Sequence, residues 1–175
     1  MASRTQARQI AVDWLYAYYL GSTIDADSMQ EDLKEQHISG AKAEFALSLY
    51  DGVVENIIVI DLAIQKYLKN WSLSRIGHLE RAILRLGVYE ICVNKLQIGI
   101  VANEMLELAK KFCEPKSVSF INGILQSVSK MEEDILTLGA KREPEIILEP
   151  EIVEIEALEV PTQTAEETQT AEASK

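Results

Sequence analysis

The stretch Glu80-Arg-Ala-Ile-Leu-Arg-Leu-Gly-Val-Tyr-Glu90 decides the fold of this chain. Aliphatic residues occupy nearly the whole circumference of a helix drawn over residues 79–93, which predicts a helix buried in the centre of the molecule. We expect the polar edge of this helix along Arg81, Arg85 and Tyr89, which follow one another at intervals of four. A central helix with a polar edge indicates a scaffold for binding, and so a binding protein rather than an enzyme.

The same helical spacing continues through most of residues 1–138, so the sequence predicts an all-α domain there. Helices are expected over about residues 3–20, 28–36, 41–68, 79–93 and 100–112, and from Pro115 to before Gly139. We expect Gly52 to break the long segment 41–68 into two helices. Trp71-Ser72 should end that unit, and Ser74 should cap a short turn.

Residues 139–175 differ from the rest in composition. They hold three basic residues against ten glutamates, a charge of −7 out of the total of −11. Residues 1–138 hold 14 basic and 18 acidic groups, a charge of −4, so the whole-chain charge is a poor guide to what the domain binds. Proline at positions 144, 150 and 161 together with the charge predicts a disordered acidic tail.

The cysteines and the N-terminus bear on the compartment. Cys92 and Cys113 both fall in apolar helical patterns and are expected to be small, reduced residues of the core. The first residues lack the basic-then-apolar layout of a signal peptide, and no apolar run approaches the ~18 residues of a membrane span. The sequence therefore predicts a cytoplasmic protein with no membrane contact.

Few residues offer catalytic chemistry. His37 and His78 do not share a spacing that would place two metal ligands on one helix face. Glu104 and Glu107 share a helix face, but a solvated or capping role is commoner for such a pair. The sequence has no glycine-rich phosphate loop and no Gly-x-Ser-x-Gly elbow. We therefore predict no catalytic site, no metal and no cofactor.

Two basic groups are candidates for a binding surface. Arg4 and Arg8 lie four apart, so both should project from one side of the first helix, near its start, where little core surrounds them. By itself this pair fits a solvated helix end better than a binding site. Lys116 is the last residue of a basic cluster that begins at Lys110. Phe120 lies four residues after Lys116. If both face outward they offer a cation and a stacking surface; the alternative is that Phe120 belongs to the core.

Over about residues 4–130 the chain resembles the NusB family of bacterial transcription antitermination factors. The matching segments are Ala7-Arg8 with Ala11-Val12 and Leu15-Tyr16, the stretch 80–90, Asn103-Glu104 with Glu107-Leu-Ala-Lys110, and Phe120-Ile-Asn-Gly-Ile-Leu125. Four ordered matches are much more specific than any one of them alone. The resemblance implies an all-helical fold of about seven helices in two small bundles.

The resemblance also implies a function. Members of the family bind the boxA element of ribosomal-operon leader RNA and pair with NusE, a small-subunit ribosomal protein, so that other Nus factors and RNA polymerase are reached indirectly. The implied RNA-binding positions are Arg4, Arg8, Lys116, Ser117 and Phe120. The implied partner-binding positions are Tyr16 and Glu80. This assignment suits the chemistry, because cations bind phosphates and an open ring can stack on an unpaired base.

The chain departs from the family pattern at two places, and two alternatives stay open. Thr5 and Gln6 stand between the two arginines, which should weaken phosphate contact, whereas Lys116 stands where relatives commonly carry an acid, which should strengthen it. One alternative is a protein-only helical adaptor that has lost RNA contact. The other is a NusB-like domain that serves an RNA methyltransferase, but this chain has no room for a catalytic domain and no cofactor loop.

Overall fold

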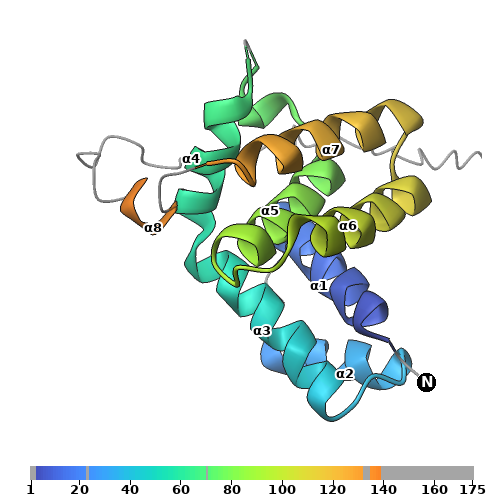
Figure 1. Cartoon of the computed structure of the whole chain (residues 1–175). Coiled ribbons are helices and arrows are strands. Elements are labelled where there is room, and N and C mark those ends of the chain that lie inside the picture. The colour runs from blue at the N-terminus through green and yellow to red at the C-terminus, as the bar shows by residue number, and fades with distance from the viewer. Residues whose placement is uncertain (1–2, 23, 70, 132–134, 139–175) are drawn as a thin grey trace, which may run out of the picture. The chain divides into compact units, whose positions relative to one another are not determined.

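The computed structural model describes residues 3–22, 24–69, 71–131 and 135–138, and the regular elements of this part are all helices (Figure 1). They are α1 (Arg4–Tyr19), α2 (Ala26–Glu35), α3 (Ala41–Glu55), α4 (Ile57–Tyr67), the 3-10 helix η1 (Leu73–Arg75), α5 (His78–Cys92), α6 (Ile98–Phe112), α7 (Pro115–Val128) and α8 (Ile135–Leu138). The all-α prediction is confirmed. Within the described residues, the single turn α8 adds to the seven α-helices expected from the sequence.

The helices form two small bundles that share α5. Helices α1, α2 and α3 pack together as the first bundle, and α4, α6, α7 and α8 form the second around α5. Helix α5 contacts α1 and α3 of the first bundle as well as α4, α6 and α7 of the second, and Figure 1 shows it in the middle of the domain. The two-bundle arrangement implied by the resemblance is therefore present.

Helix α5 is the central buried helix that the sequence predicts. Every residue from 81 to 92 is buried, and the side chains of Ile83, Leu84 and Leu86 are fully inaccessible. Burial of one such side chain contributes roughly 1.5–3 kcal/mol. Gly87 allows α6 and α7 to approach α5 closely, because a Cβ at this position would lie 2.8 Å from Leu125 Cδ2.

The predicted polar edge of α5 is wrong, because α1, α3 and α4 cover it. Arg85 is 6% exposed, and its Nε and Nη2 donate to the two carboxylate oxygens of Asp61 in α4 at 2.8 and 2.7 Å. Arg81 is 4% exposed; it donates from Nη1 to the Tyr19 hydroxyl of α1, and its guanidinium lies 4.1 Å from the centroid of that ring. Tyr89 is also buried. These charges serve packing between helices rather than an outside partner.

The long segment 41–68 does break into two helices, but at Asn56 rather than at Gly52. The Asn56 side-chain amide donates to the carbonyl oxygen of Gly52 at 2.8 Å, which competes with regular helical hydrogen bonding at that carbonyl. Gly52 is instead a buried residue of α3, where a side chain would collide with the Tyr89 hydroxyl. The glycine is thus needed for close packing against α5.

Two further predictions concern the tail and the membrane. The predicted disordered tail, residues 139–175, lies outside the described residues. Among the helices that are described, none combines the length and the apolar character needed to cross a bilayer.

Candidate nucleic-acid interface

The start of α1 is fixed by a capping box. The Ser3 hydroxyl accepts from the Gln6 backbone N–H at 3.2 Å, and the Gln6 side-chain oxygen accepts from the Ser3 N–H at 2.6 Å. Gln6 is one of the residues at which the chain departs from the family pattern, and it therefore has a structural role. The cap makes Arg4 the first helical residue and leaves its side chain exposed.

Arg8 is buried, which contradicts the prediction that little core surrounds it. Its Nε and Nη2 donate to the Glu90 carboxylate of α5 at 2.8–3.1 Å, and its Nη1 lies 3.4 Å from Glu104 Oε2 of α6. Arg8 is 4% exposed and Glu90 is fully buried. Burial by itself lowers the pKa of Arg8, but the hydrogen bonds and charge of Glu90 outweigh it, so the pKa lies above its ordinary value. The Arg8 guanidinium therefore joins α1 to α5 and α6 through ion pairs.

The two glutamates of α6 take different roles. Glu104, 21% exposed in its side chain, faces inward and pairs with Arg8. Glu107 lies at the surface and accepts from Lys110 Nζ at 2.7 Å. The expectation of a solvated residue therefore fits Glu107, whereas Glu104 completes the buried cluster.

Arg4 and Arg8 do share one side of α1, and Phe45 of α3 lies beneath both. The two guanidinium carbons lie 5.4 and 5.3 Å from the centroid of the Phe45 ring. Cation–ring contact of this kind holds α1 to α3 at the N-terminal end of the domain. Of the two arginines, Arg4 is the one that reaches the surface.

The start of α7 carries Lys116 and Phe120, and the sequence left open whether their side chains face outward. Pro115 occupies the first turn, where its fixed backbone suits a helix start. The Lys116 side chain is 84% exposed and pairs with Glu114 at 2.7 Å, which raises the pKa of Lys116 and lowers that of Glu114. Phe120 is 37% exposed. The structure therefore decides for the outward-facing alternative and against Phe120 as a core residue.

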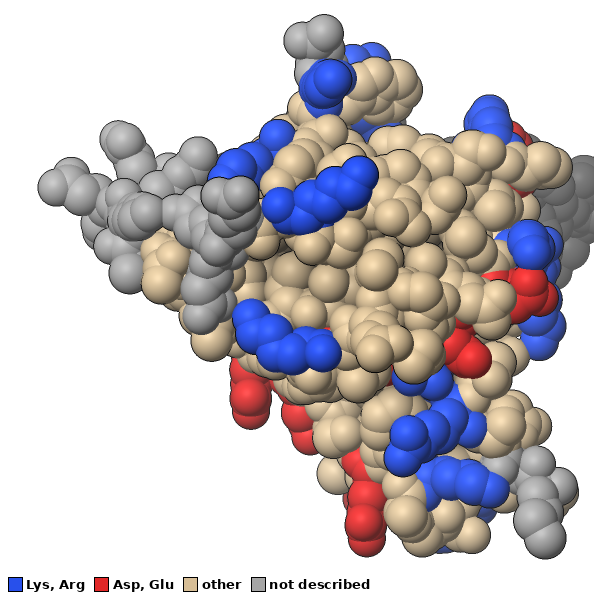
Figure 2. All heavy atoms as spheres, in the orientation of Figure 1, with Lys and Arg blue, Asp and Glu red and all other residues tan. Residues whose placement is uncertain are grey.

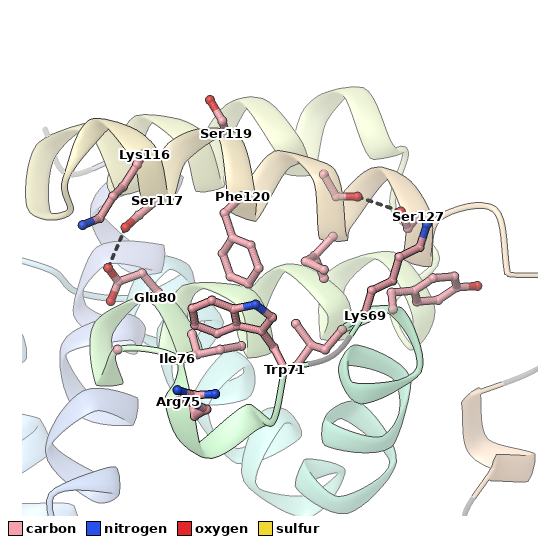
Figure 3. A pocket seen from close by; sticks show the side chains of 15 residues that line it. Lys69, Trp71, Arg75, Ile76, Glu80, Lys116, Ser117, Ser119, Phe120 and Ser127 are labelled. Carbon is pink, nitrogen blue, oxygen red and sulfur yellow. Dashed lines mark hydrogen bonds between the residues drawn. The ribbon is translucent and has the colours of Figure 1, made fainter.

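Ser117 and Glu80 are hydrogen-bonded to each other. The Ser117 hydroxyl, which is buried, donates to Glu80 Oε1 at 2.8 Å (Figure 3). The other carboxylate oxygen of Glu80 folds back over Gly77, where an added side chain would collide with it. A residue expected to bind RNA and one expected to bind the partner protein thus form one polar junction between α7 and α5.

Tyr16 lies near the other end of α1 from Arg4. It is 37% exposed, and three residues later the Tyr19 ring contacts the His78 ring at a tilt of 54°, with ring centroids 4.6 Å apart. This contact brings the end of α1 to the start of α5, so Tyr16 and Glu80 come from adjoining helix ends. Tyr16 lies twelve positions after Arg4 in the helix, which is about 18 Å along the axis.

A groove of about 830 Å³ runs between α7 and the connection from α4 to α5. Figure 3 shows Phe120 pointing into it from α7, opposite Trp71, with Arg75 below the indole and Lys69 toward the far end. Lys116 and Ser117 also line it. Its volume falls in the range of roughly 300–1,000 Å³ that is typical of ligand sites.

Sequence reasoning missed the second wall of this groove. Trp71, Lys69 and Arg75 lie in the connection between helices, where hydrophobic periodicity gives no information about exposure. The spacing of four from Trp71 to Arg75 repeats the ring-and-cation spacing of Lys116 and Phe120, and this signal could have found Trp71 and Arg75 but not Lys69.

The predicted RNA-binding residues fall into two groups rather than one patch. Arg4 is at the start of α1, whereas Lys116, Ser117 and Phe120 are at the start of α7. Between them, Lys111 at the end of α6 donates to Gln9 of α1 at 2.9 Å. Figure 2 shows basic side chains in separate groups over the top, the middle, the lower part and the right edge of this face, with acidic side chains near those of the lower part and the right edge.

Together these features define an all-helical binding protein whose open groove combines rings and cations. A family model described as the NusB family matches residues 5–130, and the chain belongs to that family.

Curated relatives support this assignment. The transcription antitermination protein NusB of a Nitratiruptor species is 46% identical over 130 residues, which cover 74% of this chain and 94% of the relative. The protein of the same name from Helicobacter pylori (strain 26695) is 45% identical over 130 residues, with the same two coverages.

Solved structures agree with the fold. NusB of T. maritima is 29% identical with a TM-score of 0.68, and the match covers 76% of this chain and 94% of that one. A chain in a crystal structure of the antitermination factors NusB and NusE in complex with dsRNA is 33% identical with a TM-score of 0.65, covering 73% of this chain and 96% of that one.

Proposed function

We propose that this protein is a transcription antitermination factor that binds boxA-type leader RNA of ribosomal RNA operons together with NusE. The observation that carries the proposal is the open ring of Phe120 beside the exposed Lys116 at the mouth of the groove. The similarity to a chain crystallised with NusE and dsRNA supports both partners.

The RNA surface in this proposal consists of Arg4 at the start of α1 and of Lys116 and Phe120 at the start of α7, where Ser117 is buried beside them. Cations attract the phosphates in a salt-dependent manner, and an aromatic ring at the surface can stack on an unpaired base. Because Arg8 is buried against Glu90, we assign it a positioning role. It holds the first turns of α1 in place so that Arg4 stays at the surface.

The partner surface in this proposal consists of Tyr16 and Glu80. A carboxylate suits a basic ribosomal protein, and an exposed tyrosine offers both apolar area and a hydroxyl. The hydrogen bond from Ser117 to Glu80 supports a link between the two surfaces, because a partner that engages Glu80 also acts on the start of α7.

The proposal has three corollaries. The protein works by binding and not by catalysis. It reaches other Nus factors and RNA polymerase indirectly, through the complex that it nucleates on nascent RNA. Its place of action is the cytoplasm, where that RNA is made.

A protein-only adaptor is the second candidate, and the burial of Arg8 favours it by removing one cation from the RNA surface. Titration of a labelled boxA-type RNA with the full chain, with and without NusE and at two salt concentrations, separates the two. RNA binding that strengthens with NusE and weakens with salt supports the proposal. Binding of NusE with no RNA binding in either mixture would favour the adaptor.

A further inference from the structure

Trp71 and Arg75 form a wall of the groove to which the proposed function gives no role. Trp71 is 57% exposed, and the Arg75 guanidinium lies 5.3 Å from the centroid of its ring. In Figure 3 the indole of Trp71 and the ring of Phe120 approach each other from opposite sides of the groove. Two exposed rings from distant parts of the sequence therefore meet at one opening.

The connection that carries Trp71 is fastened to α4 by Gln65. The Gln65 side-chain amide donates to the carbonyl oxygen of Trp71 at 2.9 Å, and its oxygen accepts from the Leu73 N–H at 3.0 Å. These two bonds hold the backbone from the Trp71 carbonyl to Leu73 against α4, directly after the residue that carries the indole. A large apolar surface held open to water in a defined position is typical of a binding site.

The charges of the groove suit a polyanion. Figure 3 shows Lys116 at one end and Lys69 at the other, with the rings between them. Glu80 is the one acidic residue in the lining, all of which the structure describes, and its Oε1 already accepts from Ser117. Rings between cations match a single RNA strand, whose phosphates alternate with unpaired bases. A groove lined by the three cations Lys69, Arg75 and Lys116 does not match an apolar helix of a protein partner.

We propose that Trp71, backed by Arg75, and Phe120 form one stacking platform for unpaired bases of a single RNA strand, with Lys69 and Lys116 against its phosphates. This inference rests on the proposed RNA-binding function and adds a second protein segment to it. Base–ring stacking tolerates any base but requires that the base be unpaired. The platform therefore selects single-stranded over paired RNA.

The tryptophans give a direct readout. The sequence has two, and Trp14 is 2% exposed with its Nε1 donating to Asp32 at 2.7 Å, so Trp71 is the one that RNA can reach. When unlabelled boxA-type RNA is titrated into the full chain, we expect quenching of the Trp71 emission. The Trp71→Phe variant should keep its affinity to within about threefold, because a ring remains, but lose the quenching.

Affinity variants test the contribution of the platform. Trp71→Ala should weaken binding of the same RNA by roughly 5- to 100-fold, as expected for loss of one base–ring stack. Phe112→Ala is the matched control, because Phe112 is 39% exposed and lies 4.8 Å from Lys111 Nζ but does not line the groove. It should leave the affinity within about twofold, since isolated surface changes have little effect.

RNAs that lack one base at successive positions sharpen the test. Each base removal and Trp71→Ala changes the binding free energy of the RNA. At the position that stacks on Trp71 these two changes should be non-additive, whereas at other positions they should add. Full additivity at every position would overturn the platform.

The outcomes separate the platform from the function on which it rests. RNA binding with no quenching of Trp71 and unchanged affinity in Trp71→Ala overturns the platform and leaves the proposed function intact. No RNA binding by the unaltered chain, with or without NusE, overturns both. Weaker NusE binding in Trp71→Ala with unchanged RNA affinity also overturns the platform, because the groove then takes a protein.

Discussion

Two regions of the molecule hold the same pair of chemical groups and use them in opposite ways. Arg8 lies 5.3 Å from the Phe45 ring, and Arg75 lies 5.3 Å from the Trp71 ring. Arg8 is 4% exposed because two glutamates cover it, whereas Arg75 and its ring face the solvent. What surrounds a cation–ring pair therefore decides whether it stabilises the fold or is available to a ligand.

The largest effect should come from the buried region. Arg8→Ala leaves Glu90 charged and unpaired in the interior, so we expect a loss of about 3–5 kcal/mol in the free energy of unfolding, measured by urea denaturation of the full chain. Arg4→Ala, one turn earlier and exposed, is the control and should change it by no more than about 1 kcal/mol, the contribution of one exposed cation–ring contact with Phe45. Equal effects of the two substitutions would contradict the distinction between the regions.

Arg8→Met combined with Glu90→Leu separates stability from RNA contact in the same region. Apolar replacement of a buried ion pair is often neutral, so we expect this double variant to recover most of the stability lost in Arg8→Ala. Its affinity for boxA-type RNA should stay within about threefold, as for changes that leave the binding surface in place. A tenfold loss of RNA affinity in a double variant that is shown to be folded would mean that Arg8 does contact the RNA.

A smaller effect is expected at the junction between the proposed surfaces. Glu80→Lys reverses a charge that suits a basic partner, so we expect NusE binding to weaken by about tenfold or more, measured by calorimetry. Glu107→Lys on α6 reverses a charge at the exposed surface and is the matched control. An undiminished complex, in a variant whose melting curve shows that it is folded, would count against Glu80 as a partner residue.

Lys116, an exposed cation of the groove, should contribute mainly to the salt dependence of RNA affinity. We expect Lys116→Ala to lower RNA affinity only a few-fold and to reduce the dependence of log affinity on log salt by about 1. Fluorescence anisotropy at four or five salt concentrations gives that slope. An unchanged slope would mean that Lys116 does not meet a phosphate.

The smallest effect is expected from the acidic segment. Removal of residues 139–175 should leave the thermal midpoint of the domain nearly unchanged, because their composition predicts no packed core of their own. Calorimetric scans of the two chains check this. A shift of several degrees would show that the domain depends on those residues.

The sequence predicted the parts of the molecule that follow from local pattern. Apolar residues nearly all round the helix at 79–93 predicted the buried α5, and the structure buries every residue from 81 to 92. Lys116 and Phe120 were recognised as a pair through their spacing alone. Periodicity could not decide whether Phe120 faced inward; that depends on which neighbours α7 receives.

The parts that sequence missed depend on distant residues. The burial of Arg8 is caused by acids 82 and 96 positions away, and no spacing within α1 reports them. The break at Asn56 depends on a side-chain bond that competes with the helix, and this outweighed the weak helix propensity of Gly52. Trp71 and Arg75 became visible as a site only when α7 was seen to lie opposite them.

The central claim is that the open ring at the start of α7 binds RNA while the buried arginine does not. The most direct measurement is the affinity of Phe120→Ala for boxA-type RNA, beside Phe112→Ala, a ring of similar exposure outside the groove. We predict a loss of roughly 5- to 100-fold for Phe120→Ala, as for one base–ring stack, and less than about twofold for Phe112→Ala. Equal affinity of both variants and the unaltered chain would contradict the claim.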